Sequence, residues 1–213
     1  MSKYATELIG TFFLVLTIGL TVLGGTLLPP LAIGASLMVM VYMGGHISGA
    51  HYNPAVTLAV FLRGKLPSSQ VLPYMIAQLV GAVAAALVVY GVMGKTLLPA
   101  PAPTAGLFAA LMVEFLFTFA LALVVLNVAM APAAAGNSYF GLAIGFTVCA
   151  AAFAGGPVSG GAFNPAVGVG PMLVHVMAGG GSYAHVWIYV VGPFLGGALA
   201  SWVYQVQHPG EGA

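Results

Sequence analysis

Charged side chains are nearly absent from this chain. Of its 213 residues only 3% are charged and 61% are hydrophobic, whereas about a quarter of the residues in a soluble domain are charged. A chain of this composition lacks the polar surface that a water-soluble fold requires. The sequence therefore excludes a soluble globular domain and predicts an integral membrane protein.

The scarcity of charge and cysteine excludes further classes. Four Lys/Arg and three Asp/Glu residues give a net charge of +1, so no basic patch for nucleic acid is expected. Cys149 stands alone and can form no intrachain disulfide. The spacing of His46 and His51 is not that of a metal site. No nucleophile–base pair or phosphate loop is present, so we expect no enzyme, no cofactor and no metal.

Long apolar runs make up most of the chain. Crossing a bilayer takes about 20 apolar residues per helix, and two shorter runs begin with Asn-Pro and reach about half of that distance. The first long run follows Lys3 and precedes no polar domain, so we interpret it as a span and not as a cleaved signal peptide. The long runs fall at about 5–28, 31–45, 71–93, 107–131, 139–155 and 184–206, and the short ones at 53–62 and 164–175.

The two halves of the chain repeat each other. Residues 31–56 (LAIGASLMVMVYMGGHISGAHYNPAV) align without gaps with residues 142–167 (LAIGFTVCAAAFAGGPVSGGAFNPAV). The sequence therefore predicts one domain, residues 1–213, made by duplication. Its parts are repeat one at about 1–95, a Pro/Ala linker at 96–106 and repeat two at 107–213.

Three spans per repeat is an odd number, so the second repeat must be inverted relative to the first. The two Asn-Pro pieces then enter the membrane from opposite faces and meet near its midplane. Lys3, Arg63 and Lys65 fall on one side and Lys95 on the other. By the positive-inside rule, we expect a multi-pass protein of the plasma (inner) membrane with both termini cytoplasmic.

Asn53 and Asn164 are the candidate central residues. Pro54 and Pro165 suit the first turn of a helix, which makes each asparagine an N-cap. Capping alone would explain one such residue. Two matched amides at mid-membrane indicate a role beyond capping, because an amide without hydrogen-bond partners in lipid is costly.

The Gly-rich segments before these residues, GGHISGAHY and GGPVSGGAF, are expected to be extended and to leave carbonyls without helical partners. With donors at the centre and acceptors on both sides, they predict a pore for small neutral hydroxylic molecules. Two helix N-termini at the centre would repel cations. The His51 ring is expected to lie away from the pore. The candidate pore carbonyls belong to Gly49, Ala50, His51, Gly160, Gly161 and Ala162.

The paired boxes SGAHYNPAV and SGGAFNPAV in an inverted repeat resemble the aquaporin, or major intrinsic protein, family over essentially the whole chain. The resemblance implies an all-α integral membrane protein with six transmembrane helices and two half-helices. It also implies a homotetramer in the lipid bilayer, with one pore per subunit. The expected function is passive conduction of water and small neutral solutes, with cation exclusion as known for the family.

The second box departs from the family pattern. The family usually has NPAR, whereas this chain has Val167; the three other filter positions fall on Ile33, Ala152 and Gly161. These residues predict a wide, apolar mouth without the filter charge. Arg63 follows the first half-helix on the cytoplasmic side and cannot replace it. The aspartate of the glycerol branch (NPARD) is also absent, so the candidate solutes include glycerol, urea, ammonia, hydrogen peroxide and metalloid hydroxides such as arsenous acid.

Several alternatives stay open at this point. Glu7 and Glu114 are either parts of a proton relay or, as the family suggests, buttresses that accept hydrogen bonds from loop backbone. Cys149 lies about one helical turn before Ala152 and faces either the pore or a helix contact. An ion- or proton-coupled secondary transporter also uses inverted repeats and broken helices. A non-conducting structural or adhesion protein is the third interpretation.

Overall fold

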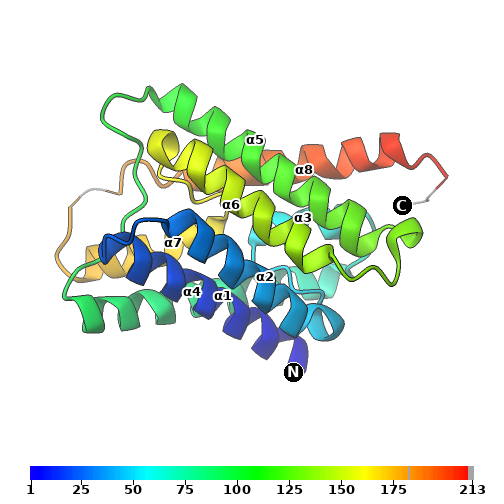
Figure 1. Cartoon of the computed structure of the whole chain (residues 1–213), viewed down its shortest axis with the longest axis horizontal. Coiled ribbons are helices and arrows are strands. Elements are labelled where there is room, and N and C mark those ends of the chain that lie inside the picture. The colour runs from blue at the N-terminus through cyan, green and yellow to red at the C-terminus, as the bar shows by residue number, and fades with distance from the viewer. Residues whose placement is uncertain (182, 211–213) are drawn as a thin grey trace.

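The structure, a computed structural model, describes residues 1–181 and 183–210 and is all-helical over this range (Figure 1). A π-helical turn, Leu126–Met130, continues α5, and a short 3-10 turn, Pro132–Ala134, follows it. The helices are α1 (Ser2–Leu23), α2 (Pro29–Ser48), α3 (Pro54–Leu62), α4 (Ser68–Met93), α5 (Leu107–Val125), α6 (Phe140–Ser159), α7 (Pro165–Met177) and α8 (Ile188–Gln207).

Five of these helices are long and apolar enough to cross a membrane: α1, α2, α4, α5 with its π-helical turn, and α6. The sixth, α8, has 20 residues, as do α2 and α6. It falls below the other five in hydropathy because it carries Tyr189, Tyr204, Gln205 and Gln207. The half-helices α3 and α7 have nine and 13 residues, too few to span.

Equivalent helices make equivalent contacts in the two halves. α1 packs on α4 as α5 packs on α8, α3 packs on α8 as α7 packs on α4, and α2 packs on α6. Figure 1 shows α3 and α7 extending toward opposite ends of the molecule, while α1 begins and α8 ends at the same end. This arrangement is that of an inverted repeat.

Glycines allow the close helix contacts at matched positions. A Cβ on Gly81 of α4 would lie 2.3 Å from the Leu8 carbonyl oxygen of α1, and one on Gly196 of α8 would lie 2.4 Å from that of Phe115 on α5. Since the Cβ of a larger residue would overlap these backbone atoms, only glycine allows the approach. Small residues play this part in membrane helix packing in general.

The Gly-rich segments before the Asn-Pro boxes are helical over most of their length, so the prediction of a long extended segment is wrong in part. α2 continues to Ser48 and α6 to Ser159, and each ends at a left-handed glycine, Gly49 (φ +88°) or Gly160 (φ +91°). Gly44 and Gly155 stay in the helices because their small size admits neighbouring side chains, among them the Tyr52 and Phe163 rings. Only four residues separate each left-handed turn from the next helix.

Candidate functional site

Each asparagine caps its own half-helix and binds the opposite repeat. Asn53 Oδ1 accepts a hydrogen bond from the Ala55 N–H (2.8 Å), as Asn164 Oδ1 does from the Ala166 N–H (2.9 Å). The Nδ2 groups donate across the repeat boundary. That of Asn53 binds the Phe163 carbonyl at 2.9 Å, and that of Asn164 binds the Tyr52 carbonyl at 2.8 Å.

An amide nitrogen carries two N–H groups. One from each asparagine is used in the cross-repeat bond, so one remains for a molecule in the pore. Both side chains are buried, and both line the same central cavity. The structure therefore brings the two predicted central donors together from positions 53 and 164.

Two buried glutamates hold the short segments that lead to the asparagines. Glu7 of α1 accepts from the backbone N–H groups of His51 (3.0 Å) and Tyr52 (2.7 Å). Glu114 of α5 accepts from those of Ala162 (3.0 Å) and Phe163 (2.6 Å). These bonds hold a strained backbone, because Ala50, Tyr52 and Phe163 all adopt positive φ near +50°. This geometry is that of a buttress.

Two tyrosines that the sequence analysis did not single out complete the supports. The Tyr74 hydroxyl of α4 donates to the Ser48 carbonyl at 2.8 Å, and the Tyr189 hydroxyl of α8 donates to the Ser159 carbonyl. Each serine also donates its own hydroxyl proton to the glutamate of its repeat. The signal in the sequence was a tyrosine at the matching place in the third span of each half.

The central cavity is small and mainly apolar. Its water-accessible volume is about 30 Å³, which is room for about two water molecules. The cavity is lined by Ile33, Gly161 and Val167, three of the four expected filter residues. Ala152, half-buried on α6, does not line it; Val148, one turn earlier on α6, does, since a valine side chain reaches further than an alanine methyl group.

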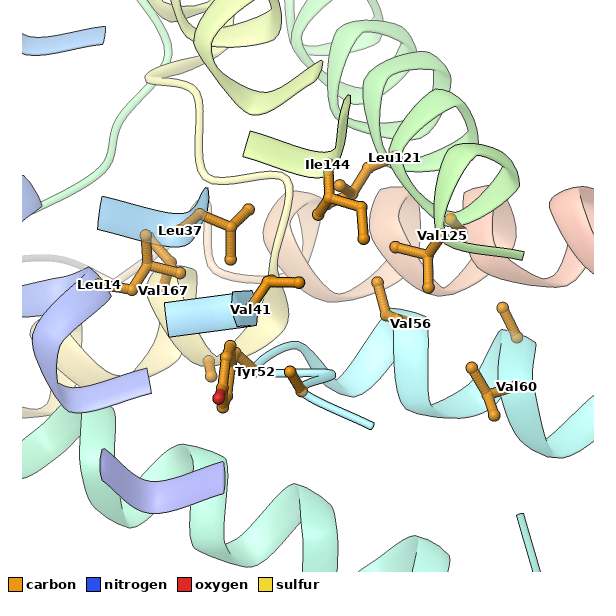
Figure 2. Packing of buried hydrophobic residues seen from close by; sticks show 14 of the residues in the cluster. Leu14, Leu37, Val41, Tyr52, Val56, Val60, Leu121, Val125, Ile144 and Val167 are labelled. Atoms are coloured by element: carbon orange, nitrogen blue, oxygen red, sulfur yellow. The ribbon is translucent and has the colours of Figure 1, made fainter. Parts of the chain in front are cut away.

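Aliphatic side chains from the spans and from α3 line the cavity beside Ile33, Gly161 and Val167 and make it narrower than the wide mouth expected from the filter residues alone. Sequence reasoning missed this set, because apolar residues in a span look alike whether they face lipid or the pore. Figure 2 shows several of these side chains gathered between the helices. The additional lining residues are Leu14, Ile18, Leu37, Val56, Leu121, Val125, Ile144 and Val148.

The candidate pore carbonyls divide into two groups. Four of these carbonyls belong to residues that line the central cavity, which are Ala50, His51, Gly161 and Ala162. Gly49 lines a second, larger cavity, and Gly160 is exposed and packs against Ala100 of the linker. The last two are displaced because each forms the left-handed turn that ends its helix.

His51 lies between the two cavities and belongs to the lining of both. Its Nδ1 lies 3.1 Å from the Thr57 hydroxyl, and its ring centre lies 5.1 Å from that of Tyr74. The side chain is therefore held by a buried network, which also includes the Gln78 amide bound to Thr57 and Glu7. His51 as a whole is 5% exposed.

We call the second cavity the vestibule. It lies at the end of the molecule where α1 begins, which is also the end at which α8 finishes (Figure 1). Its volume is about 540 Å³. Its walls come from the ends of α1 and α2, the α3–α4 connection and the segment between α5 and α6. Sequence reasoning missed it, because these segments are far apart in the chain and carry no shared motif.

Cys149 and Arg63 lie outside the central cavity. The Cys149 thiol is buried at the contact of α6 with α2, where its Cβ faces Gly34. Arg63 is buried after α3, with its guanidinium 5.6 Å from the centre of the Tyr204 ring. Over residues 1–181 and 183–210, no group of three His, Cys, Asp or Glu side chains could hold a metal ion.

Comparison with known proteins identifies a group of similar chains. A model of the family described as major intrinsic protein matches residues 3–204. The chain is 39% identical to aquaporin NIP1-1 of Zea mays, with 97% of this chain and 74% of that protein aligned, and 35% identical to nodulin-26 of Glycine max, with 97% and 78% aligned. The solved aquaglyceroporin of Plasmodium falciparum superimposes with a TM-score of 0.86 at 22% identity, covering 98% of this chain and 97% of that one.

Proposed function

This chain belongs to the major intrinsic protein family, and from that premise we propose that it forms a passive membrane pore for water and other small neutral solutes. The observation that carries the proposal is the pair of asparagine amides, each with a free N–H, in a cavity lined otherwise by aliphatic side chains and loop backbone. The amides donate hydrogen bonds at one level, and the candidate acceptors are the backbone carbonyls of the four predicted loop residues that line the cavity. A small neutral molecule can therefore replace its hydrogen bonds to water one at a time as it passes the amides.

A coupled transporter normally places an ionisable group at the binding site. Within residues 1–181 and 183–210, His51 is the only Asp, Glu, Lys, Arg or His that lines the central cavity, and it lies at the inner end. Glu7 and Glu114 are bound by loop N–H groups and do not line it. The site therefore supports a channel better than a transporter.

The filter of the proposed pore is apolar and has no arginine. Ile33, Gly161 and Val167 provide its surface near the outer end, and Ala152 stands on the same helix as Val148. Such a surface does not select solutes by charge-assisted hydrogen bonds. We expect it to pass several neutral molecules, with water among them and with urea, ammonia, hydrogen peroxide and metalloid hydroxides as further candidates.

The proposal includes the placement of the pore in a plasma (inner) membrane as a homotetramer, with both termini cytoplasmic. The common end of α1 and α8 carries Lys3 and Lys65, whereas Lys95 follows α4 at the other end. This distribution supports the orientation by the positive-inside rule. Crosslinking of the purified protein tests the tetramer, and protease access to a tag on each terminus tests the orientation.

Stopped-flow light scattering on proteoliposomes, with a panel of osmolytes that includes urea and glycerol, tests the function. We expect water permeability well above that of protein-free liposomes, and measurable permeability for at least one neutral solute. If the protein raised the permeability of none of them, the proposed function would be wrong. The order of the solutes would then give the working width of the filter.

A further inference from the structure

The vestibule, which is at the inner end in the proposed orientation, is lined by positively charged side chains and by no carboxylate of the described residues. Lys3 and Lys65 line it from two different segments, and His46 and His51 add two titratable rings. Among its lining residues there is no Asp or Glu. Both lysines are exposed, and neither forms an ion pair within residues 1–181 and 183–210.

The Glu7 carboxylate holds the backbone of His51 and Tyr52, and both of its oxygens already accept hydrogen bonds. It is fully buried, does not line the vestibule, and accepts from the Ser48 hydroxyl, the Gln78 amide and two backbone N–H groups. These four donors oppose its negative charge locally. The field inside the vestibule is therefore dominated by the two lysines.

The central cavity, by contrast, carries no Lys, Arg, Asp or Glu among the described residues that line it. Val167 occupies the place where the family usually has an arginine. The fixed positive side-chain charge along this pathway thus lies at its inner end and not at its outer filter.

On the premise of the proposed function, we infer that Lys3 and Lys65 exclude cations at the inner mouth of the pore, in the place of a filter arginine. A cavity with low-dielectric walls focuses the field of charges on its rim and lowers the local concentration of ions of the same sign. His51 belongs to the lining of both cavities, so the vestibule and the central cavity lie on either side of this one residue. A cation that uses this pathway must cross the field, whereas a neutral solute is unaffected.

The test compares the double variant Lys3→Gln/Lys65→Gln with the wild type in proteoliposomes. The leak of K⁺ is measured with a potassium-selective electrode while a protonophore carries compensating charge, and urea and water permeabilities are measured in parallel. We expect the K⁺ leak of the double variant to rise on the order of fivefold at low salt, with neutral permeabilities unchanged. Lys95→Gln, at the opposite end, is the matched control and should leave the leak as in the wild type.

The salt dependence of the wild type gives a second test that needs no variant. K⁺ is kept constant while N-methylglucamine chloride raises the ionic strength from about 0.01 M to about 1 M, which shortens the screening length from about 30 Å to about 3 Å. The leak of the wild type should rise toward that of the double variant, and Lys3→Arg/Lys65→Arg should behave as the wild type.

Each outcome bears on one conclusion. An unchanged K⁺ leak in the double variant, or a wild-type leak that does not respond to screening, would overturn the vestibule as the cation barrier. A wild type that conducts neither water nor any neutral solute would instead overturn the proposed function. The neutral permeabilities measured in the same vesicles separate the two failures.

Discussion

The side chain of Asn53 performs two tasks with different atoms. Its oxygen caps α3, and its nitrogen binds the Phe163 carbonyl and presents a second N–H to the cavity. Asn164 does the same for α7 and the Tyr52 carbonyl. Since the tasks lie on different atoms, substitution can separate them.

Asn53→Ser and Asn164→Ser should keep the cap and remove the donor, because a serine hydroxyl also caps helices but is too short to replace the amide N–H. We expect about tenfold lower water permeability per protein and a loss of about 1–3 kcal/mol of stability, because the serine also leaves the buried Phe163 or Tyr52 carbonyl without its donor. Asn→Ala at the same positions should in addition cost about 1 kcal/mol of stability. Serine variants with normal flux would refute the central-donor role.

Val167→Arg should make the pore more selective for water. The side chain at 167 is buried beside the central cavity, and a guanidinium there adds bulk, five N–H donors and a fixed charge. We expect the ratio of urea to water permeability to fall about tenfold, which corresponds to about 1.4 kcal/mol on the barrier.

Val167→Leu adds bulk without charge and is the control for Val167→Arg. It should lower the urea permeability less, and it should leave any cation leak unchanged. If the ratio stays the same in Val167→Arg proteoliposomes of equal protein density, residue 167 does not control entry.

At the level of single residues, the sequence identified cavity-lining positions that belong to a motif. It did not identify lining positions that hold ordinary aliphatic side chains. The asparagines and their boxes were found because Asn-Pro inside an apolar chain is unusual and occurred twice. The aliphatic lining, such as Leu14 and Ile144, carries no such mark. Ala152 was placed by counting back from the box, which fixes a position on a helix but not how far its side chain reaches.

At the scale of the helices, contacts through glycine determine how closely the elements approach. Gly81 and Gly196 occupy matching places where α4 meets α1 and α8 meets α5. Gly91 of α4, in contrast, has no neighbouring atom within 4 Å of an added Cβ. The same helix therefore offers a close-packed glycine and an open one.

Gly81→Ala should destabilise the protein by about 2 kcal/mol, because the new methyl group would overlap the Leu8 carbonyl oxygen and force α1 and α4 apart. Gly91→Ala should be neutral or should stabilise by up to about 1 kcal/mol through helix propensity. Thermal unfolding in detergent, followed by circular dichroism, measures both. Equal melting temperatures for the two variants would show that the close contact is not needed.

The helices themselves were largely predictable, whereas the connections were not. Hydropathy and the bounding Pro and Gly residues placed all eight helices within a few residues of their observed ends. The Gly-rich ends of α2 and α6 were misjudged, because glycine disfavours an isolated helix but is tolerated in one packed against Tyr52 or Phe163. Tertiary contact decided the local conformation there.

At the scale of the whole molecule, the structure contains a vestibule of about 540 Å³ at one end and a central cavity of about 30 Å³. The duplication and the inversion followed from the sequence, because identical boxes and an odd number of spans require them. The vestibule did not, since it is enclosed by segments that meet only in the folded protein. Its charge pattern depends on Lys3 and Lys65, which are 62 positions apart in the printed sequence.

Flux through the intact protein should be passive. We expect urea uptake to rise linearly with its gradient, and to be unaffected by a protonophore or by replacement of Na⁺ with K⁺, because no Asp, Glu, Lys or Arg is among the described residues that line the central cavity. Isotope uptake into proteoliposomes measures this. Uptake that needs a proton or sodium gradient would favour the transporter instead.

The exchange of hydrogen bonds between the two repeats has a consequence for how the protein is made. Asn53 and its partner Phe163 are 110 positions apart. At about 5–20 residues per second, a ribosome needs roughly 5 to 20 s to add that length. Throughout this interval the first re-entrant segment has its buttress, Glu7, but not the carbonyl that its amide binds. The first repeat must therefore wait in the insertion machinery, or in water at the membrane surface, until the second repeat is synthesised.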